Sequence, residues 1–161
     1  MRKLVFSIAL LSIGSLVSCN QPVKEKKEDL KETPQAVNKE VPFVIAKNYF
    51  VKNNYQGKDS TEVKKISSQA EFDVVFGAAA LMGKEGKPTP IDFSKQHAIA
   101  VIHPVTDKAT SLDAPTLSTN GTTLDFSYQL KVGEKQSYSI HPYLLLVVDN
   151  EYQGDIVTTV K

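Results

Sequence analysis

The residues best suited to nucleophilic chemistry lie around one histidine in the last third of the chain. Ser137 and Ser139 precede His141, and Asp149 follows it, so the three residue types of a serine hydrolase occur close together. Such an enzyme needs its nucleophile, base and orienting acid within hydrogen-bond reach. Serines on a predicted strand do not form a nucleophile elbow, and the chain has no Gly-x-Ser-x-Gly sequence. We therefore assign no catalytic residue and expect a protein that is not an enzyme, with a hydrolase using Ser139 and His141 as a less favoured alternative.

Histidine is also the residue type with the greatest potential for metal binding. The histidines are His97, His103 and His141, and none stands at a short ligand spacing from another. A zinc or copper site needs imidazole, carboxylate or thiolate groups that converge. His103 and His141 each precede a proline at the end of an apolar run, which favours structural roles at exposed strand ends. We predict no metal site and no cofactor, with a weak site on these two histidines as the alternative if the strand ends are neighbours.

Asp92 lies between two hydrophobic residues, in Ile91-Asp92-Phe93-Ser94, directly before a predicted strand. A carboxylate in this position can accept the backbone N–H groups of Ser94 and Lys95 in an Asx turn, so we predict a structural role. Glycoside hydrolysis would instead require two acids on either side of a sugar-binding groove. The chain has no tryptophan to stack on a sugar ring, which disfavours carbohydrate chemistry.

Tyrosines and lysines near predicted loops are the best candidates for a binding surface. A tyrosine with an exposed hydroxyl is a common anchor at protein interfaces. We expect the contact region to include the loop surfaces from Lys84 to Thr89 and from Val105 to Thr110. The predicted binding residues are Tyr49, Tyr55, Lys84, Lys87 and Tyr152.

The amino terminus has the layout of an export signal. Arg2 and Lys3 precede an apolar run that ends at Val17 and is too short for a comfortable membrane span. The run closes with Leu16-Val17-Ser18-Cys19, which resembles the lipobox of bacterial lipoproteins. The resemblance implies a signal peptide of residues 1–18 and a diacylglyceryl group on the Cys19 sulfur, often with a further acyl chain on its amine. Asn20 follows this cysteine, and a residue other than aspartate there resembles the outer-membrane sorting pattern of enterobacterial lipoproteins. The resemblance implies that the protein is anchored in the outer membrane, on its periplasmic or surface face.

Charge and cysteine content narrow the possible partners. Loss of Arg2 and Lys3 reduces the 19 basic side chains to 17, against 18 acidic ones, and leaves no arginine. This balance offers no basic surface for nucleic acid and lacks the side chain best suited to phosphate. Cys19 is the only cysteine, which excludes an internal disulfide and a thiolate zinc cluster. The expected partners are a membrane, through Cys19, and an unknown protein.

Composition divides the rest of the chain into two parts. Residues 19–41 are rich in charge and proline and bury too little apolar surface to fold, so we predict a lipidated cysteine followed by a flexible tether. Residues 42–161 carry the apolar patterns and are expected to form a single domain. We predict that this domain is α+β, with a mostly antiparallel sheet of about six strands and one main helix.

One segment has a helical pattern with a defined start. Ser68-Gln69-Ala70-Glu71 matches a capping box, in which the serine and glutamate side chains satisfy free amides at the helix start. Phe72, Val75, Phe76 and Ala79 then recur at helical spacing and form one apolar stripe. The pattern predicts a helix from about Gln69 to Met82 that packs this stripe on the core.

Apolar patterning predicts the strands. They are Phe43 to Lys52, His97 to His103, Leu112 to Thr119, Leu124 to Val132, Gln136 to Ile140, Tyr143 to Val148 and Ile156 to Val160. The second and sixth are apolar almost throughout, as in strands covered on both faces. Asn120-Gly121 favours a two-residue type I′ turn between the third and fourth. Tyr128 and Tyr138 share the inward parity of their strands and are expected in the core or at its edge.

The order of the predicted elements carries a family resemblance. A strand is followed by a Ser-x-x-Glu-Phe helix start at Ser68, by Ile91-Asp92-Phe93-Ser94 leading into the strand at Ala98, by a polar-alternating hairpin and by a final aliphatic strand. This order, from Ile66 to Val148, is similar to the C-terminal domain of PrcB-like protease-complex subunits. Members carry a glycine-rich turn with an aromatic residue where this chain has Pro104 to Thr110. The resemblance implies a non-catalytic partner or regulator of a secreted protease.

These features together favour a lipid-anchored protein of the cell envelope whose domain binds another protein and performs no chemistry. A small-ligand binding lipoprotein, in which the sheet covers a pocket, is the first alternative. An envelope hydrolase is the less favoured one.

Overall fold

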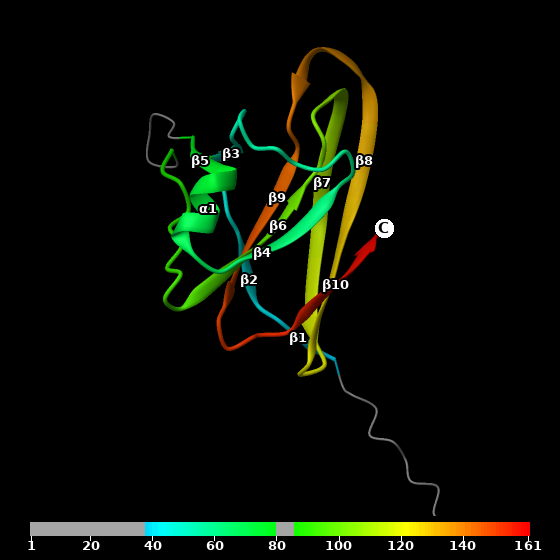
Figure 1. Cartoon of the computed structure of the whole chain (residues 1–161). Coiled ribbons are helices and arrows are strands. Elements are labelled where there is room, and N and C mark those ends of the chain that lie inside the picture. Colours follow the sequence, from blue (N-terminus) through cyan, green and yellow to red (C-terminus); the bar gives the residue numbers. More distant parts are fainter. Residues whose placement is uncertain (1–37, 80–85) are drawn as a thin grey trace, which may run out of the picture. The chain divides into compact units, whose positions relative to one another are not determined.

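The structure is a computed structural model that describes residues 38–79 and 86–161, and these contain ten strands and one helix (Figure 1). Cys19 and Lys84 lie outside the described residues. The described part of the chain has no helix long and apolar enough to span a membrane. The elements are β1 (Lys39–Glu40), β2 (Phe43–Ile45), β3 (Tyr49–Val51), β4 (Glu62–Ile66), α1 (Gln69–Val75), β5 (Phe76–Ala78), β6 (Gln96–Ile102), β7 (Thr106–Thr119), β8 (Thr123–Ile140), β9 (Tyr143–Asp149) and β10 (Asp155–Val160).

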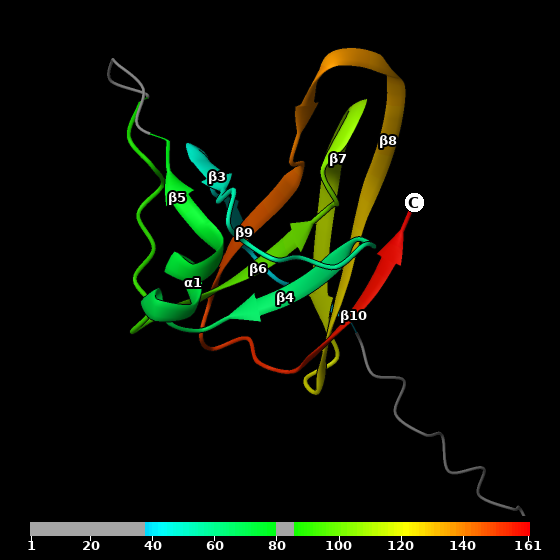
Figure 2. The same ribbon diagram turned by 45° about the horizontal axis from the view of Figure 1, so that its top comes forward.

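These elements form three layers. One four-stranded sheet has the order β1-β7-β8-β10, and the other has the order β2-β9-β6-β4. All pairs between the described strands are antiparallel except β8 with β10. The small sheet of β3 and β5 lies with α1 on the side of β6 and β9 that faces away from β7 and β8 (Figures 1 and 2). The prediction of a mostly antiparallel fold with one helix is confirmed. The domain is nevertheless mostly β and not evenly α+β, since its ten strands exceed the six expected and its helix has only seven residues.

The first core fills the space between the two four-stranded sheets. Every second residue of β6, of β9 and of the first part of β8 points into it, because side chains alternate between the faces of a strand. Tyr128 is buried there, as predicted. The buried members are Val41, Ile99, Val101, Leu112, Leu117, Leu124, Phe126, Tyr128, Leu144, Leu146 and Val148.

The second core lies beneath the layer of α1, β3 and β5. The alternate residues of β6 and β9 face this layer, so both strands are covered on both faces, and the prediction for these two strands is confirmed. The buried members are Ala46, Val51, Ile66, Phe72, Val75, Phe76, Ala98, Ala100, Ile102, Leu145 and Val147.

The helix is shorter than predicted, since α1 ends at Val75 and not near Met82. Phe76 has an extended backbone, with φ −112° and ψ 148°, and it begins β5, which pairs with β3. A Cβ atom at Gly77 would lie 2.5 Å from the ring of Phe50 in β3, so the glycine leaves room for that ring across the strand pair. Phe72, Val75 and Phe76 of the predicted apolar stripe are buried, although Phe76 is in a strand. Ala79, the last member, follows β5 and is half-buried, so the helical stripe is confirmed only for Phe72 and Val75.

Ser68 caps α1, and the variant Ser68→Ala tests the cap. Ser68 Oγ accepts the backbone N–H of Glu71 at 3.2 Å, and Glu71 Oε2 accepts the N–H of Ser67 at 2.9 Å. The predicted capping box is therefore present, with the reciprocal bond one residue earlier. We expect Ser68→Ala to lower the free energy of unfolding by about 1 kcal/mol in urea denaturation. Ser67→Ala keeps its backbone amide and should cost less than about 0.5 kcal/mol, and equal losses would contradict a stabilising cap.

A long hairpin of β7 and β8 forms the centre of the first sheet. Asn120 and Gly121 lie at its turn, but the turn is longer than the two residues predicted, because Thr119 pairs with Leu124. Asn120 Oδ1 accepts the N–H groups of Thr122 and Thr123 at 2.9 and 2.8 Å, and Gly121 has φ +94°. The asparagine side chain thus organises a wider turn than a type I′ pair.

Strand β8 is continuous from Thr123 to Ile140, so the two strands predicted here are one. Its pairing with β7 changes register at three places, two of them between Thr106 and Thr110. Each change breaks the alternation of faces along the strand. Tyr138 lies within one of these irregular stretches, between Lys135 and Ile140. It is 59% exposed, so its predicted place in the core is wrong.

Other differences lie near the start of the domain. The predicted strand from Phe43 to Lys52 is divided into β2 and β3 by Asn48, which has φ 63°. β1 and the buried Val41 belong to the fold, so ordered structure begins before the predicted boundary at residue 42. β4 was not predicted, because its charged side chains, typical of an edge strand, hide the pattern.

Candidate functional site

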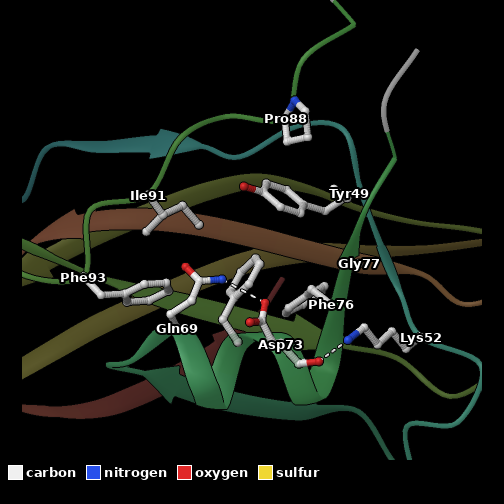
Figure 3. A pocket seen from close by; sticks show the side chains of 11 residues that line it. Tyr49, Lys52, Gln69, Asp73, Phe76, Gly77, Pro88, Ile91 and Phe93 are labelled. Carbon is white, nitrogen blue, oxygen red and sulfur yellow. Dashed lines mark hydrogen bonds between the residues drawn. The ribbon is translucent and has the colours of Figure 1, made fainter.

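A pocket of about 450 Å³ lies between α1, β3, β5 and the segment that precedes β6 (Figure 3). This volume is within the range of pockets that bind small ligands. Most of the lining is aromatic or aliphatic, and the polar members come from α1 and from the residue that follows β3. The lining residues are Tyr49, Lys52, Gln69, Phe72, Asp73, Phe76, Gly77, Ala78, Pro88, Ile91 and Phe93.

The Phe72 ring joins the aromatic residues of the pocket. Its centroid lies 5.1 Å from that of Tyr49 in an edge-to-face arrangement, 5.1 Å from that of Phe76 and 5.7 Å from that of Phe93. Edge-to-face and tilted pairs at these distances are favourable beyond their buried area. The contacts fix side chains from β3, α1, β5 and the segment before β6 around one hollow, and Figure 3 shows Tyr49, Ile91 and Phe93 directed toward it from different sides.

Hydrogen bonds hold the segment Lys87–Thr89 against the start of β3. Tyr49 Oη donates to the Thr89 carbonyl oxygen at 2.6 Å, and the Lys47 amide donates to Thr89 Oγ1 at 3.0 Å. Asn48 Nδ2 donates to the Lys87 carbonyl oxygen at 2.9 Å. Burial, with a smaller effect of Tyr143, raises the pKa of Tyr49, so its hydroxyl stays a donor. This wall of the pocket is therefore fixed through its backbone.

The polar lip of the pocket consists of Lys52, Gln69 and Asp73. Gln69 Nε2 donates to Asp73 Oδ1 at 2.8 Å, and Lys52 Nζ donates to the Asp73 carbonyl oxygen (Figure 3). Gln69 and Asp73 are exposed and stand one turn apart on α1. The lip therefore offers an ammonium group, an amide and a carboxylate to a polar group, while the interior accepts an apolar one.

Asp92 directly precedes Phe93, which lines the pocket, and its side chain forms a local turn. Asp92 Oδ1 accepts from Ser94 Oγ at 2.6 Å and from the Ser94 N–H at 3.1 Å, so the predicted Asx turn is confirmed. The Lys95 amide donates instead to the Asp92 carbonyl oxygen at 2.9 Å. The two bonds from Ser94, with the nearby Lys95 ammonium, hold the pKa of Asp92 below its usual value.

A polar cluster lies at the other end of the second sheet, around Glu62. Tyr55 Oη donates to Glu62 Oε1 at 2.6 Å, and Lys64 Nζ donates to Tyr55 Oη at 3.2 Å. Burial and the bond to Glu62 raise the pKa of Tyr55. Burial lowers the pKa of His141, which interacts electrostatically with Glu62 and His103. The hydroxyl of Tyr55 is thus engaged within the domain.

His103 and His141 lie at strand ends, as predicted, but both are half-buried and not exposed. His103 donates its amide to the Pro142 carbonyl oxygen at 2.9 Å, so the ends of β6 and β9 are neighbours. His103 Nδ1 lies 2.6 Å from Thr61 Oγ1. Within residues 38–79 and 86–161, no group of three or more histidine, cysteine or acidic residues is placed to hold a metal ion.

The residues considered for a hydrolase are not brought together. Ser137 and Ser139 are exposed on β8. His141 precedes β9 and Asp149 ends it, so the seven residues of that strand, roughly 20 Å, separate base and acid. Asp149 instead accepts from Gln96 Nε2 at 3.3 Å.

The structure divides the predicted binding residues among several places. Tyr49 lines the pocket, and Lys87 is exposed beside it. Tyr55 belongs to the Glu62 cluster, and Tyr152 packs against the first core beneath the Lys39 ammonium, 5.7 Å from its ring. The sequence pattern placed Phe72 in the core without indicating a pocket. The sequence feature that could have indicated the pocket is Phe93, in the run Ile91-Asp92-Phe93-Ser94, because this residue lines it.

His97 gives the fold a pH dependence that can be measured. It is fully buried, and its Nδ1 lies 3.2 Å from Asn150 Oδ1, while Nε2 has no partner among the described residues. Burial lowers its pKa below the unfolded value near 6.5. As pH falls from 7 to 5, His97 becomes protonated in the unfolded chain but stays neutral in the folded one. The free energy of unfolding therefore falls by at most about 1.4 kcal/mol per pH unit.

The variant His97→Gln is expected to show a shallower loss of unfolding free energy between pH 7 and pH 5. Part of the pH dependence should remain in this variant, because burial also lowers the pKa of His141. Asp92 and Asp113 have lowered pKa values and affect stability only at more acidic pH. Urea denaturation at several pH values measures the slope, and an unchanged slope would contradict the assignment to His97.

Comparisons of the chain with protein-family models, curated proteins and solved structures found no match.

Proposed function

We propose that this domain is a non-catalytic binding module of a lipid-anchored envelope protein. It binds a segment of another protein by accepting one apolar side chain of that segment in the pocket. The observation that carries the proposal is the aromatic pocket beside α1. Aromatic side chains beside polar groups at the mouth suit an apolar anchor residue whose backbone stays outside the pocket.

The polar lip supports a peptide segment as the occupant. Lys52, Gln69 and Asp73 offer donors and acceptors of both signs at the mouth, where the amides and carbonyls of an extended chain would pass. Tyr49 and Lys52 donate to backbone carbonyl oxygens, and the Asp73 carboxylate accepts from the Gln69 amide. This arrangement favours recognition over chemistry.

The anchor and the class of partner complete the proposal. The lipobox-like sequence that ends in Cys19 supports attachment to the envelope, with the charged segment between Cys19 and β1 as the tether. The resemblance to the C-terminal domain of PrcB-like subunits favours a secreted protease, or one of its substrates, as the partner.

Site-specific photocrosslinking tests the proposal in native envelopes. The photoreactive amino acid p-benzoylphenylalanine is placed at Ala78, which is exposed and lines the pocket, or at Val74, which is exposed on α1 outside the pocket. We expect one protein adduct from position 78, identified by mass spectrometry, and none of that mass from position 74. Ala78→Trp should abolish co-purification of the identified protein, and Val74→Trp should leave it intact. Adducts that do not differ between the positions would overturn the proposal.

A small ligand is the second candidate, because the pocket volume of about 450 Å³ is sufficient for one. A compound that binds only the folded state raises its stability in proportion to the logarithm of concentration. We expect a thermal-shift screen of apolar carboxylic acids to show saturable stabilisation that Ala78→Trp removes. Equal stabilisation of the native protein and of Ala78→Trp would exclude the pocket as the binding site.

A further inference from the structure

Strand β10 is an edge strand without the usual protection against pairing. Each four-stranded sheet has two edges: β1 and β2 are two and three residues long, and β4 carries Lys64 and Lys65. Short length and lysines are common defences of an edge. The six residues of β10 contain no lysine, no proline and no break in register, and Val157 and Val160 are 51% and 54% exposed. Such an edge is a template for another strand.

The outward backbone groups of β10 belong to its even-numbered residues. Lys161 donates its amide to the Tyr128 carbonyl oxygen at 2.8 Å, so the odd-numbered residues direct their backbone toward β8. Adjacent residues of a strand direct theirs to opposite sides. Ile156, Thr158 and Val160 therefore present N–H and C=O groups away from the sheet, and none of these groups has a backbone partner among the described residues. Figure 2 shows β10 at the margin of the domain.

We propose that the partner of this edge is a second copy of the same chain, joined through antiparallel pairing of β10 with β10. In the register that we infer, the two Thr158 residues face each other on a two-fold axis, and Ile156 faces Val160 of the second copy. All three pairs are made by even-numbered residues, so each is a hydrogen-bonded pair. The interface uses the same surface on both copies, as closed two-fold symmetry requires.

Side-chain packing supports this register. Ile156 packs against the first core. Thr158 and Val160 lie on the same face of β10 as Ile156, because they pair with Phe126 and Tyr128 of β8, which are members of that core. Val160 is nevertheless half exposed, because the opposite sheet does not cover it. Pairing places the exposed Val160 of each copy beside Ile156 of the other, which extends the apolar layer across the interface.

Charge gives a second argument for a copy of this chain as the occupant. Asp155 and Lys161 flank the strand, and the inferred register places Asp155 of each copy opposite Lys161 of the other. Opposite charges on facing positions stabilise a strand pair, and like charges destabilise it. The strand is therefore complementary to itself. A pairing of this length buries less than the roughly 1,200 Å² of a standard interface, so we expect a dimer that dissociates on dilution.

Disulfide trapping tests the register in the full chain with Cys19→Ser, in which an introduced cysteine is the sole thiol. Thr158→Cys is expected to give a disulfide-linked dimer under mild oxidation, because facing residues of a hydrogen-bonded pair lie about 5.5 Å apart between Cα atoms. Thr159→Cys is the control: its pair is Val157, and two residues 159 are about 7–8 Å apart on the diagonal. Mixing Val157→Cys with Thr159→Cys should give the mixed dimer. Dimers from both single positions, or from neither, overturn the proposal.

A charge exchange supplies an independent reading in sedimentation velocity. Asp155→Lys or Lys161→Asp alone should raise the dimer dissociation constant about tenfold, because two attractive pairs become repulsive. The double variant, Asp155→Lys with Lys161→Asp, should restore the native value at matched concentration. A native chain that stays monomeric at every concentration, or a double variant no better than the singles, overturns the proposal. These outcomes are independent of the pocket and its partner.

Discussion

The variant Phe72→Ala is expected to lower the free energy of unfolding by about 3–5 kcal/mol. Phe72 is 3% exposed, and its ring contacts those of Tyr49, Phe76 and Phe93. Truncation removes the apolar transfer energy of the ring and leaves a cavity that fixed neighbours cannot close. Since domains have total stabilities of about 5–15 kcal/mol, a large fraction of the fold's stability depends on this side chain.

Val74→Ala is the matched control for this variant. Val74 lies on the same helix, and it is 64% exposed. We expect its truncation to change the unfolding free energy by less than about 0.5 kcal/mol in the same urea titration. A loss below about 1 kcal/mol for Phe72→Ala would show that the third layer can collapse around the missing ring.

The second large effect is expected for Gly154→Ala, at about 3 kcal/mol or more of unfolding free energy. Gly154 has φ +141°, a conformation that L residues rarely adopt. A Cβ atom there would lie 2.4 Å from the Thr122 carbonyl oxygen and 2.9 Å from its carbonyl carbon. Backbone strain and a clash with backbone atoms both oppose the substitution, and neither is relieved by a rotamer change.

Gly121→Ala separates these two causes. Gly121 also has positive φ, +94°, but an added Cβ would meet no atom within 4 Å. We expect it to cost about 1–2 kcal/mol from backbone conformation alone. The difference between the two alanine variants, measured by urea denaturation, isolates the contact of Gly154 with Thr122. Equal losses would mean that the chain before β10 shifts away from the hairpin turn.

The sequence predicted the elements in which local chemistry and periodicity agree. Ser68 and Glu71 defined the helix start, because capping depends only on neighbouring residues. β6 and β9 were recognised from continuous apolar runs, and Asp92 from its turn chemistry. These features depend on short segments, so the remainder of the fold does not alter them.

The features that were missed depend on residues far apart in the chain. The helix ends at Val75 because β5 pairs with β3, more than twenty residues earlier. Tyr138 is exposed because register changes between β7 and β8 interrupt the alternation. The pocket requires β3, α1, β5 and the segment before β6 together, so Tyr49 was singled out only as a loop tyrosine and Phe72 only as a core residue.

The pairing of β2 with β9 has a consequence for the time at which the domain can fold. Phe43 of β2 pairs with Val148 of β9, so β2, near the start of the domain, cannot pair until β9, near its end, is present. A polypeptide that emerges from its amino terminus, whether from a ribosome or through a translocation pore, cannot complete this sheet until nearly its whole length has appeared. High contact order of this kind slows folding. The topology thus delays completion of the second sheet until the residues of β9 are available to pair with β2.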